Sequence, residues 1–135
     1  MGQGVPAHVH ARAVLAAVVE ARPRGLTMSQ LVAATERSPS QVGVGIRHLR
    51  QIAAAEHLSP LTWTKKDGYR MVDEPEVWIG YERAFFRAEH HRIAAFIAGT
   101  LAPHQQRTPH DPYIRTVMAQ MGAIESTLDL LTRLG

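Results

Sequence analysis

A pair of capping boxes joined by a short link is the sequence feature that most restricts the fold. Thr27 is followed by Gln30, and Ser38 is followed by Gln41 at the same spacing. In such a box the first hydroxyl accepts a hydrogen bond from the later amide, and the later side chain accepts from the first amide. The sequence therefore predicts two helices that begin at these boxes, the first ending near Ala34, with a tight turn between them.

The apolar periodicity predicts the helices around this turn. A helix over residues 6–21 is expected to end at the breaker Arg22-Pro23-Arg24-Gly25. The helix after Ser38 is expected to run to about His57, with one apolar stripe made of Val42, Ile46 and Leu49.

Two glycines interrupt the same helix. Gly43 and Gly45 each cost roughly 1 kcal/mol relative to alanine inside a helix, so each needs a reason to be there. Two reasons stay open: close approach of the backbone to DNA, or tight packing against the helix of residues 27–34.

A β-hairpin is predicted after the third helix. Residues 61–66 and 69–72 are β-prone, and Asp67-Gly68 between them predicts a type I′ turn with positive φ at both residues. Trp63 and Tyr69 could stack on nucleic acid, but aromatic residues on short strands are more often buried, so we expect them in the core. Three helices followed by a hairpin predict a mainly α fold with a small β-hairpin, a winged helix-turn-helix over residues 1–73.

Charge is distributed unevenly along the chain. Residues 1–72 hold nine Lys and Arg against four Asp and Glu, a balance of +5, whereas residues 73–135 hold six against eight, a balance of −2. A basic half joined to a mildly acidic half indicates that only the first half faces a polyanion.

The outward side of the third helix and the hairpin tip form the predicted DNA-binding surface. Glutamine and arginine can form paired hydrogen bonds with base edges, and serine bonds bases or phosphates. Cations on a hairpin suit phosphate contact, and they also protect an exposed strand edge. The predicted DNA-binding residues are Ser38, Ser40, Gln41, Val44, Arg47, His48, Lys65, Lys66 and Arg70.

Residues 26–72 resemble the winged-helix domains of small bacterial regulators of the MarR and PadR families. Leu31, the Ser-Pro-Ser-Gln start of the third helix, its apolar stripe and the basic hairpin tip carry the resemblance. The whole chain also resembles RacP-like proteins of actinobacterial mobile elements. We expect a dimeric, sequence-specific regulator of transcription that binds double-stranded DNA, with the third helix in the major groove. The alternative is a winged-helix module that binds protein in a replication or partition assembly.

Residues 74–135 are expected to form a helical dimerisation module. The sequence predicts a long helix over 75–101, a polar loop over 104–110 and a last helix from Asp111 to Leu134. The last helix carries a heptad seam. We expect the seam to pair between the chains of a homodimer, or with the long helix of the same chain. Its members are Ile114, Val117, Met121, Ile124, Leu128 and Leu131.

Composition argues against several other functions. The chain has no cysteine, which excludes disulfides and thiol catalysis. The adjacent His90 and His91 point about 100° apart on a helix, so we expect no metal site, and we expect no cofactor and no enzymatic activity. No export signal or membrane span is apparent, which favours the cytoplasm. A small-molecule effector between the C-terminal helices stays open, with no motif that supports it.

Overall fold

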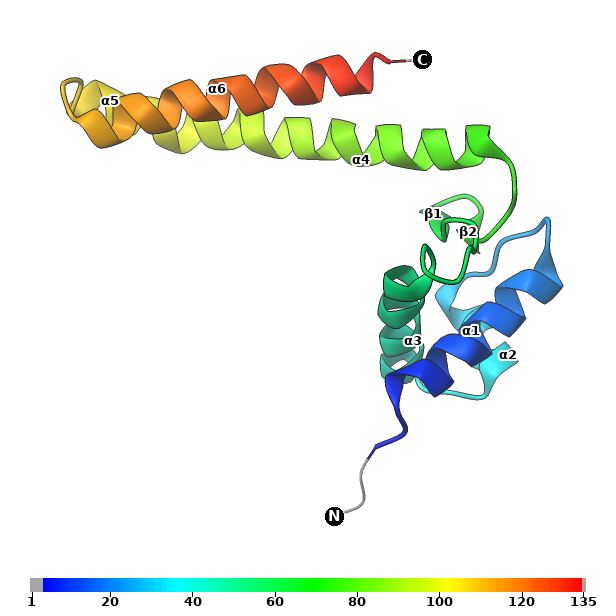
Figure 1. The fold of residues 1–135 in the computed structure, drawn as a ribbon. Coiled ribbons are helices and arrows are strands. Elements are labelled where there is room, and N and C mark those ends of the chain that lie inside the picture. Colours follow the sequence, from blue (N-terminus) through cyan, green and yellow to red (C-terminus); the bar gives the residue numbers. More distant parts are fainter. Residues whose placement is uncertain (1–3, 135) are drawn as a thin grey trace. The chain divides into compact units, whose positions relative to one another are not determined.

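The computed structural model describes residues 4–134, which divide into two compact units after Tyr81. The first unit holds three helices, a hairpin and the first turns of a fourth helix; the second holds the rest of that helix and the remaining helices (Figure 1). The elements are α1 (Ala7–Ala21), α2 (Met28–Thr35), α3 (Pro39–Ile52), β1 (Thr62–Thr64), β2 (Gly68–Arg70), α4 (Pro75–Phe96), the π-helix η1 (Ile97–Leu101), α5 (Ala102–Arg107) and α6 (Pro112–Thr132). The mainly helical architecture with a small antiparallel hairpin confirms that part of the prediction.

Both capping boxes are formed. The Thr27 hydroxyl accepts from the Gln30 amide at 3.2 Å, and Gln30 Oε1 accepts from the Thr27 amide at 2.8 Å. The corresponding bonds between Ser38 and Gln41 measure 3.1 and 3.0 Å. Local side-chain chemistry therefore sets the starts of α2 and α3, as the sequence predicts.

The predicted end of α3 near His57 is wrong, because α3 stops at Ile52. Residues 53–57 form turns, and His57 has a left-handed φ of 57°. The Leu58 amide donates to the Ala53 carbonyl at 2.8 Å, a bond typical of a chain leaving a helix through a left-handed residue. Such an exit usually employs glycine, so the sequence carried no signal for it.

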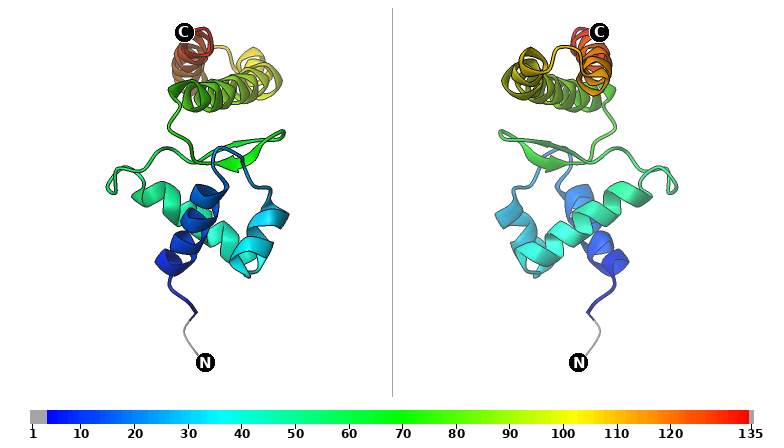
Figure 2. Two further views of the ribbon diagram at one scale, coloured as in Figure 1. Left: turned by 90° about the vertical axis from the view of Figure 1, so that its right-hand side faces the viewer. Right: turned by 90° about the vertical axis from the view of Figure 1, so that its left-hand side faces the viewer.

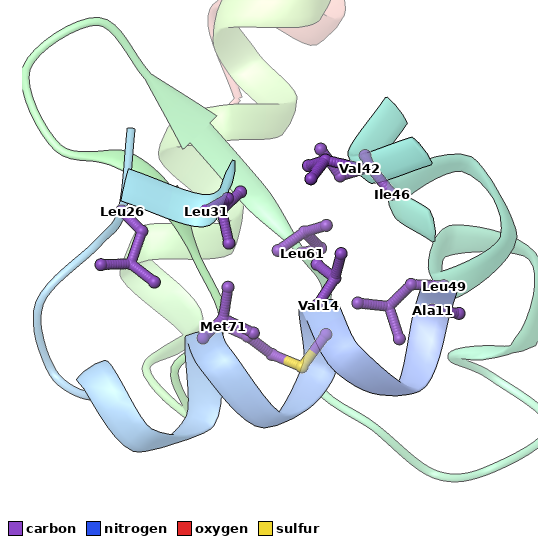
Figure 3. Close-up of a cluster of buried hydrophobic side chains, with 10 residues drawn as sticks. Ala11, Val14, Leu26, Leu31, Val42, Ile46, Leu49, Leu61 and Met71 are labelled. Atoms are coloured by element: carbon purple, nitrogen blue, oxygen red, sulfur yellow. The ribbon is translucent and has the colours of Figure 1, made fainter. Parts of the chain in front are cut away.

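The core of the first unit lies between the helices and the hairpin. Figure 3 shows Leu31 of α2, Val14 of α1, Leu61 and Met71 converging on one cluster. The predicted stripe of α3 belongs to this cluster, since Val42, Ile46 and Leu49 are all buried.

Gly45 is where α1 and α3 approach most closely. A Cβ at this position would lie 2.8 Å from the His10 carbonyl oxygen and 2.9 Å from Val14 Cγ2. Figure 2 shows, in two opposite views, that α1 crosses α3. The partner of the tight packing is thus α1, not the helix of residues 27–34 that the sequence suggested.

The hairpin differs from the predicted type I′ turn. Thr64 pairs with Gly68 across a turn of Lys65, Lys66 and Asp67, and Gly68 alone has a positive φ, of 73°. β2 also pairs with the chain ahead of α2, since the Tyr69 amide donates to the Leu26 carbonyl at 2.7 Å. A Cβ on Gly68 would lie 2.5 Å from that carbonyl oxygen, so this glycine serves the pairing with residue 26 as well as the turn.

The second unit is a helical hairpin in which α4 and α6 run antiparallel (Figure 1). Arg83, the second residue of this unit, donates to the carbonyl of Leu134 beyond α6. Asp111 caps α6 as predicted, accepting from the Tyr113 amide at 2.9 Å. No helix among residues 4–134 is long and apolar enough to cross a membrane.

The predicted long helix to residue 101 and the predicted loop over 104–110 are both wrong in part. The helix widens into η1 at Ile97 and continues as α5, so the loop begins only after Arg107. Pro103 lies in the first turn of α5, and proline disrupts a regular helix because it has no amide hydrogen and clashes with the preceding turn. The π-turn of η1 ends two residues before the proline, where a regular helix would lose a hydrogen bond.

Candidate nucleic-acid interface

The orientation of α3 follows from its buried stripe. Val42 and Leu49 are fully buried, so the opposite side of the helix faces solvent. At about 100° per residue, that side presents Ser40, Val44, Arg47 and Gln51. Three of these side chains are exposed, and Val44 is half-buried. We call this set the outer face of α3.

Arg47 is the one cation of the outer face. Its side chain is exposed and forms no ion pair with any residue in the described part of the chain. Its Nη1 atom lies 3.6 Å from the place a Cβ on Gly43 would take. The guanidinium of Arg47 thus passes beside Gly43, and even a Cβ there would make only an ordinary contact with it.

Gln51 was missed by the sequence analysis. It is exposed and stands four residues after Arg47 and seven after Val44, which places it on the same side of α3. Extending that spacing by one further turn would have found it. Its amide offers a donor and an acceptor beside Arg47.

Two of the predicted DNA-binding residues, Ser38 and Gln41, already bond to each other in the capping box of α3. The Ser38 hydroxyl accepts from the Gln41 amide, and Gln41 Oε1 accepts from the Ser38 amide. A paired contact with adenine requires that same oxygen. Only the Gln41 side-chain amide group is left to donate, so Gln41 is a weaker candidate for base contact than Arg47.

The turn before Ser38 is held to α1 by a hydrogen bond between Arg37 and the buried His10. Arg37 Nε donates to His10 Nδ1 at 2.8 Å, and Arg37 Nη1 donates to the Thr35 carbonyl at 3.1 Å. His10 is 5% exposed. This arginine therefore ties the link between α2 and α3 to α1 and is not part of the outer face.

His48 lies to one side of the outer face and is half-buried. Glu56, which follows α3, is bonded to α1 through Arg12, whose Nη2 lies 2.7 Å from Glu56 Oε2. The hydrogen bond to Arg12 lowers the pKa of Glu56 and raises the pKa of Arg12. This pair fastens α1 to the turn after α3.

The three predicted hairpin cations are not equivalent. Lys65 and Lys66 are exposed in the turn and have no ion-pair partner among residues 4–134. Arg70 lies on β2, where its Nη2 is 3.5 Å from Asp67 Oδ2 and its side chain is only 23% exposed. Its Nε is buried without a hydrogen-bond partner among the described residues. The hairpin thus presents two unpaired cations, and Arg70 mainly supports the turn.

Trp63 is not in the core, contrary to the prediction. Its side chain is 45% exposed on β1, whereas Tyr69 packs against the core from β2. The two ring centroids are 6.4 Å apart. The hairpin therefore carries an exposed aromatic surface beside its two lysines.

The predicted heptad seam of α6 is divided between two environments. Ile114 is fully buried inside the chain, while Val117, Met121, Leu128 and Leu131 are half-buried. Ile124 is exposed. The intramolecular hairpin that the sequence left open thus uses part of the seam.

Residues 4–134 contain no group of three or more histidine, aspartate or glutamate side chains that could hold a metal ion. Comparison with protein-family models, curated proteins and solved structures finds no match to the chain.

Proposed function

We propose that the first unit is a winged helix-turn-helix that binds double-stranded DNA, and that the protein is a dimeric regulator of transcription. The observation that carries the proposal is the outer face of α3. It presents an unpaired arginine between small and polar side chains, directly opposite a buried stripe. A helix of this kind fits the major groove, where arginine recognises guanine through two hydrogen bonds.

The hairpin supports the same function in a different way. Lys65 and Lys66 have no ion-pair partner among the described residues, and they would contact phosphates beside the groove. Phosphate contacts add affinity without sequence preference, and this affinity falls as salt rises. In this arrangement Arg47 supplies selectivity and the two lysines supply general affinity.

The test begins with selection of bound sequences from a random duplex pool, followed by Arg47→Ala. We expect the variant to lose about 1–3 kcal/mol of binding free energy on the best sequence and to lose preference at one base position. Arg50→Ala is the matched control, because Arg50 is an exposed arginine on the same helix whose Nη2 donates to the Tyr81 hydroxyl at 3.2 Å. The control should keep its sequence preference. Equal preference in the parent and Arg47→Ala would refute the docking of α3.

The exposed Trp63 favours a second function, a module that binds protein. An exposed aromatic side chain on the hairpin suits the centre of a protein interface, where tryptophan is enriched. The duplex selection separates the two functions. If no sequence is enriched and Lys65→Ala with Lys66→Ala leaves duplex binding unchanged, the protein-binding module replaces the regulator.

A further inference from the structure

The second unit buries very little of its own apolar surface. Leu101 and Ile114 are the buried hydrophobic residues among its described positions. Several large apolar side chains stay exposed, namely Phe85, Phe96, Tyr113, Ile124 and Leu130. A helical hairpin of this size gains little stability from so small a core, so it is expected to need further apolar contacts.

The burial pattern shows which side of α4 faces α6. Phe86, Ile93 and Ile97 are half-buried, and Leu101 follows them into the core. At about 100° per residue, Phe85 and Phe96 lie roughly 80–100° around α4 from the centre of that side. These two phenylalanines are therefore not used in the contact with α6.

The burial pattern of α6 likewise shows which of its sides faces α4. Its contact side is centred on Ile114, Met121 and Glu125, which are buried or half-buried. Ile124 and Leu131 lie roughly 80–100° around the helix from that centre. They form a second apolar stripe, beside the one that contacts α4.

Both second stripes lie on one side of the hairpin. Seen from the N-terminus of its own helix, each stripe lies anticlockwise of the contact side. Because α4 and α6 are antiparallel and face each other (Figure 1), the same sense of rotation brings both stripes to the same side. Phe85, Phe96, Ile124 and Leu131 thus make one continuous surface, which we call the Phe96–Ile124 face.

Charge is segregated away from the Phe96–Ile124 face. The charged residues of α6 and its C-cap, Arg115, Glu125, Asp129 and Arg133, lie toward α4 or on the other side of the hairpin. On α4 the face includes one neutral pair, in which Arg92 Nη1 lies 3.0 Å from Glu89 Oε1, and it is bordered by the exposed Glu82, one turn before Phe85. A shallow depression between these side chains, Ile93 and Phe96 could receive a side chain of a partner.

We infer that two copies of this chain pair through the Phe96–Ile124 face, so that two hairpins form a four-helix arrangement. A face made mainly of apolar side chains favours an apolar partner surface, and a twofold axis places it against an identical surface. Helices of this length extend about 30 Å, and two of them side by side present about 600 Å² per copy. The pairing would bury about 1,200 Å² in total, the lower end of what stable interfaces bury.

The inference rests in part on the proposed function, because it identifies the surface through which the two copies of the proposed dimeric regulator pair. Its test uses no DNA, so the two can fail separately. The full chain is weighed by light scattering at micromolar concentration. A dimer has twice the mass of the 14.9 kDa chain.

Ile124→Glu and, separately, Phe96→Glu should each raise the dimer dissociation constant at least about a hundredfold, because a twofold interface would bury two unpaired carboxylates. Leu130→Glu is the matched control. Leu130 is 54% exposed and Ile124 45%, but Leu130 lies about 120° away around α6. Circular dichroism checks that each variant keeps the helical content of the parent.

The inference holds if the parent is a dimer, both variants of the Phe96–Ile124 face are monomers and Leu130→Glu is a dimer. A monomeric parent overturns it. So does a parent dimer that either face variant leaves intact or that Leu130→Glu dissociates, since the pairing would then use another surface.

Discussion

The close approach of α1 and α3 can be tested with two glycines of one helix. Gly45→Ala places a Cβ 2.8 Å from the His10 carbonyl oxygen and 2.9 Å from the His10 carbonyl carbon. Because these are backbone atoms, α1 must move, and overpacking of this kind costs about 1–3 kcal/mol. Because the gain in helix propensity offsets roughly 1 kcal/mol of this cost, we expect a net loss of up to about 2 kcal/mol in the free energy of unfolding.

Gly43→Ala is the internal control, since it makes the same chemical change two positions away. The nearest atom to its new Cβ would be Arg47 Nη1 at 3.6 Å, an ordinary contact with a flexible side chain. We expect this variant to gain about 0.5–1 kcal/mol from propensity alone. Because the propensity gain is common to both variants, Gly45→Ala should be less stable than Gly43→Ala by the cost of overpacking, about 1–3 kcal/mol.

The assay is denaturant unfolding followed by tryptophan fluorescence. Both tryptophans, Trp63 and Trp78, belong to the first unit, so the signal reports that unit alone. Trp78 Nε1 donates to the Val72 carbonyl at 2.7 Å, which ties this probe to the folded state of the unit. If Gly45→Ala proves as stable as Gly43→Ala, the spacing of α1 and α3 does not require glycine and the packing argument fails.

Three further outcomes follow from individual contacts. Ser38→Ala should lower the free energy of unfolding by about 1 kcal/mol, measured by the same fluorescence, because the cap of α3 is lost; an unchanged value would mean that the cap contributes nothing. Lys65→Ala with Lys66→Ala should reduce the slope of log affinity against log salt by about 2 on any duplex, and an unchanged slope would place the hairpin off the DNA. The pKa of Glu56 is lowered in the folded state by Arg12, so its contribution is present above the pKa of an ordinary glutamate and is lost as the pH falls through the folded value. Glu56→Gln should accordingly be less stable than the parent at neutral pH and equal to it in acid, and a difference independent of pH would contradict this assignment.

Features set by neighbouring residues could be predicted from the sequence. The starts of α2, α3 and α6 depend on caps that bond within three residues, and all three begin where the sequence places them. The buried stripe of α3 depends only on helical spacing, and it too is confirmed. The side of α3 that carries Arg47 followed from the same spacing, so most of the candidate site could be named in advance.

Features set by distant segments could not be predicted. Gly45 is required because α1 passes against it, and Gly68 is held by pairing with residue 26. The side of the hairpin that stays apolar depends on how α4 and α6 rotate toward each other. Capping bonds and helical periodicity depend on residues a few positions apart, so the sequence shows them directly. The close approach of two helices, the pairing of a strand with a distant segment and the rotation of one helix toward another are decided only when segments far apart in the chain meet.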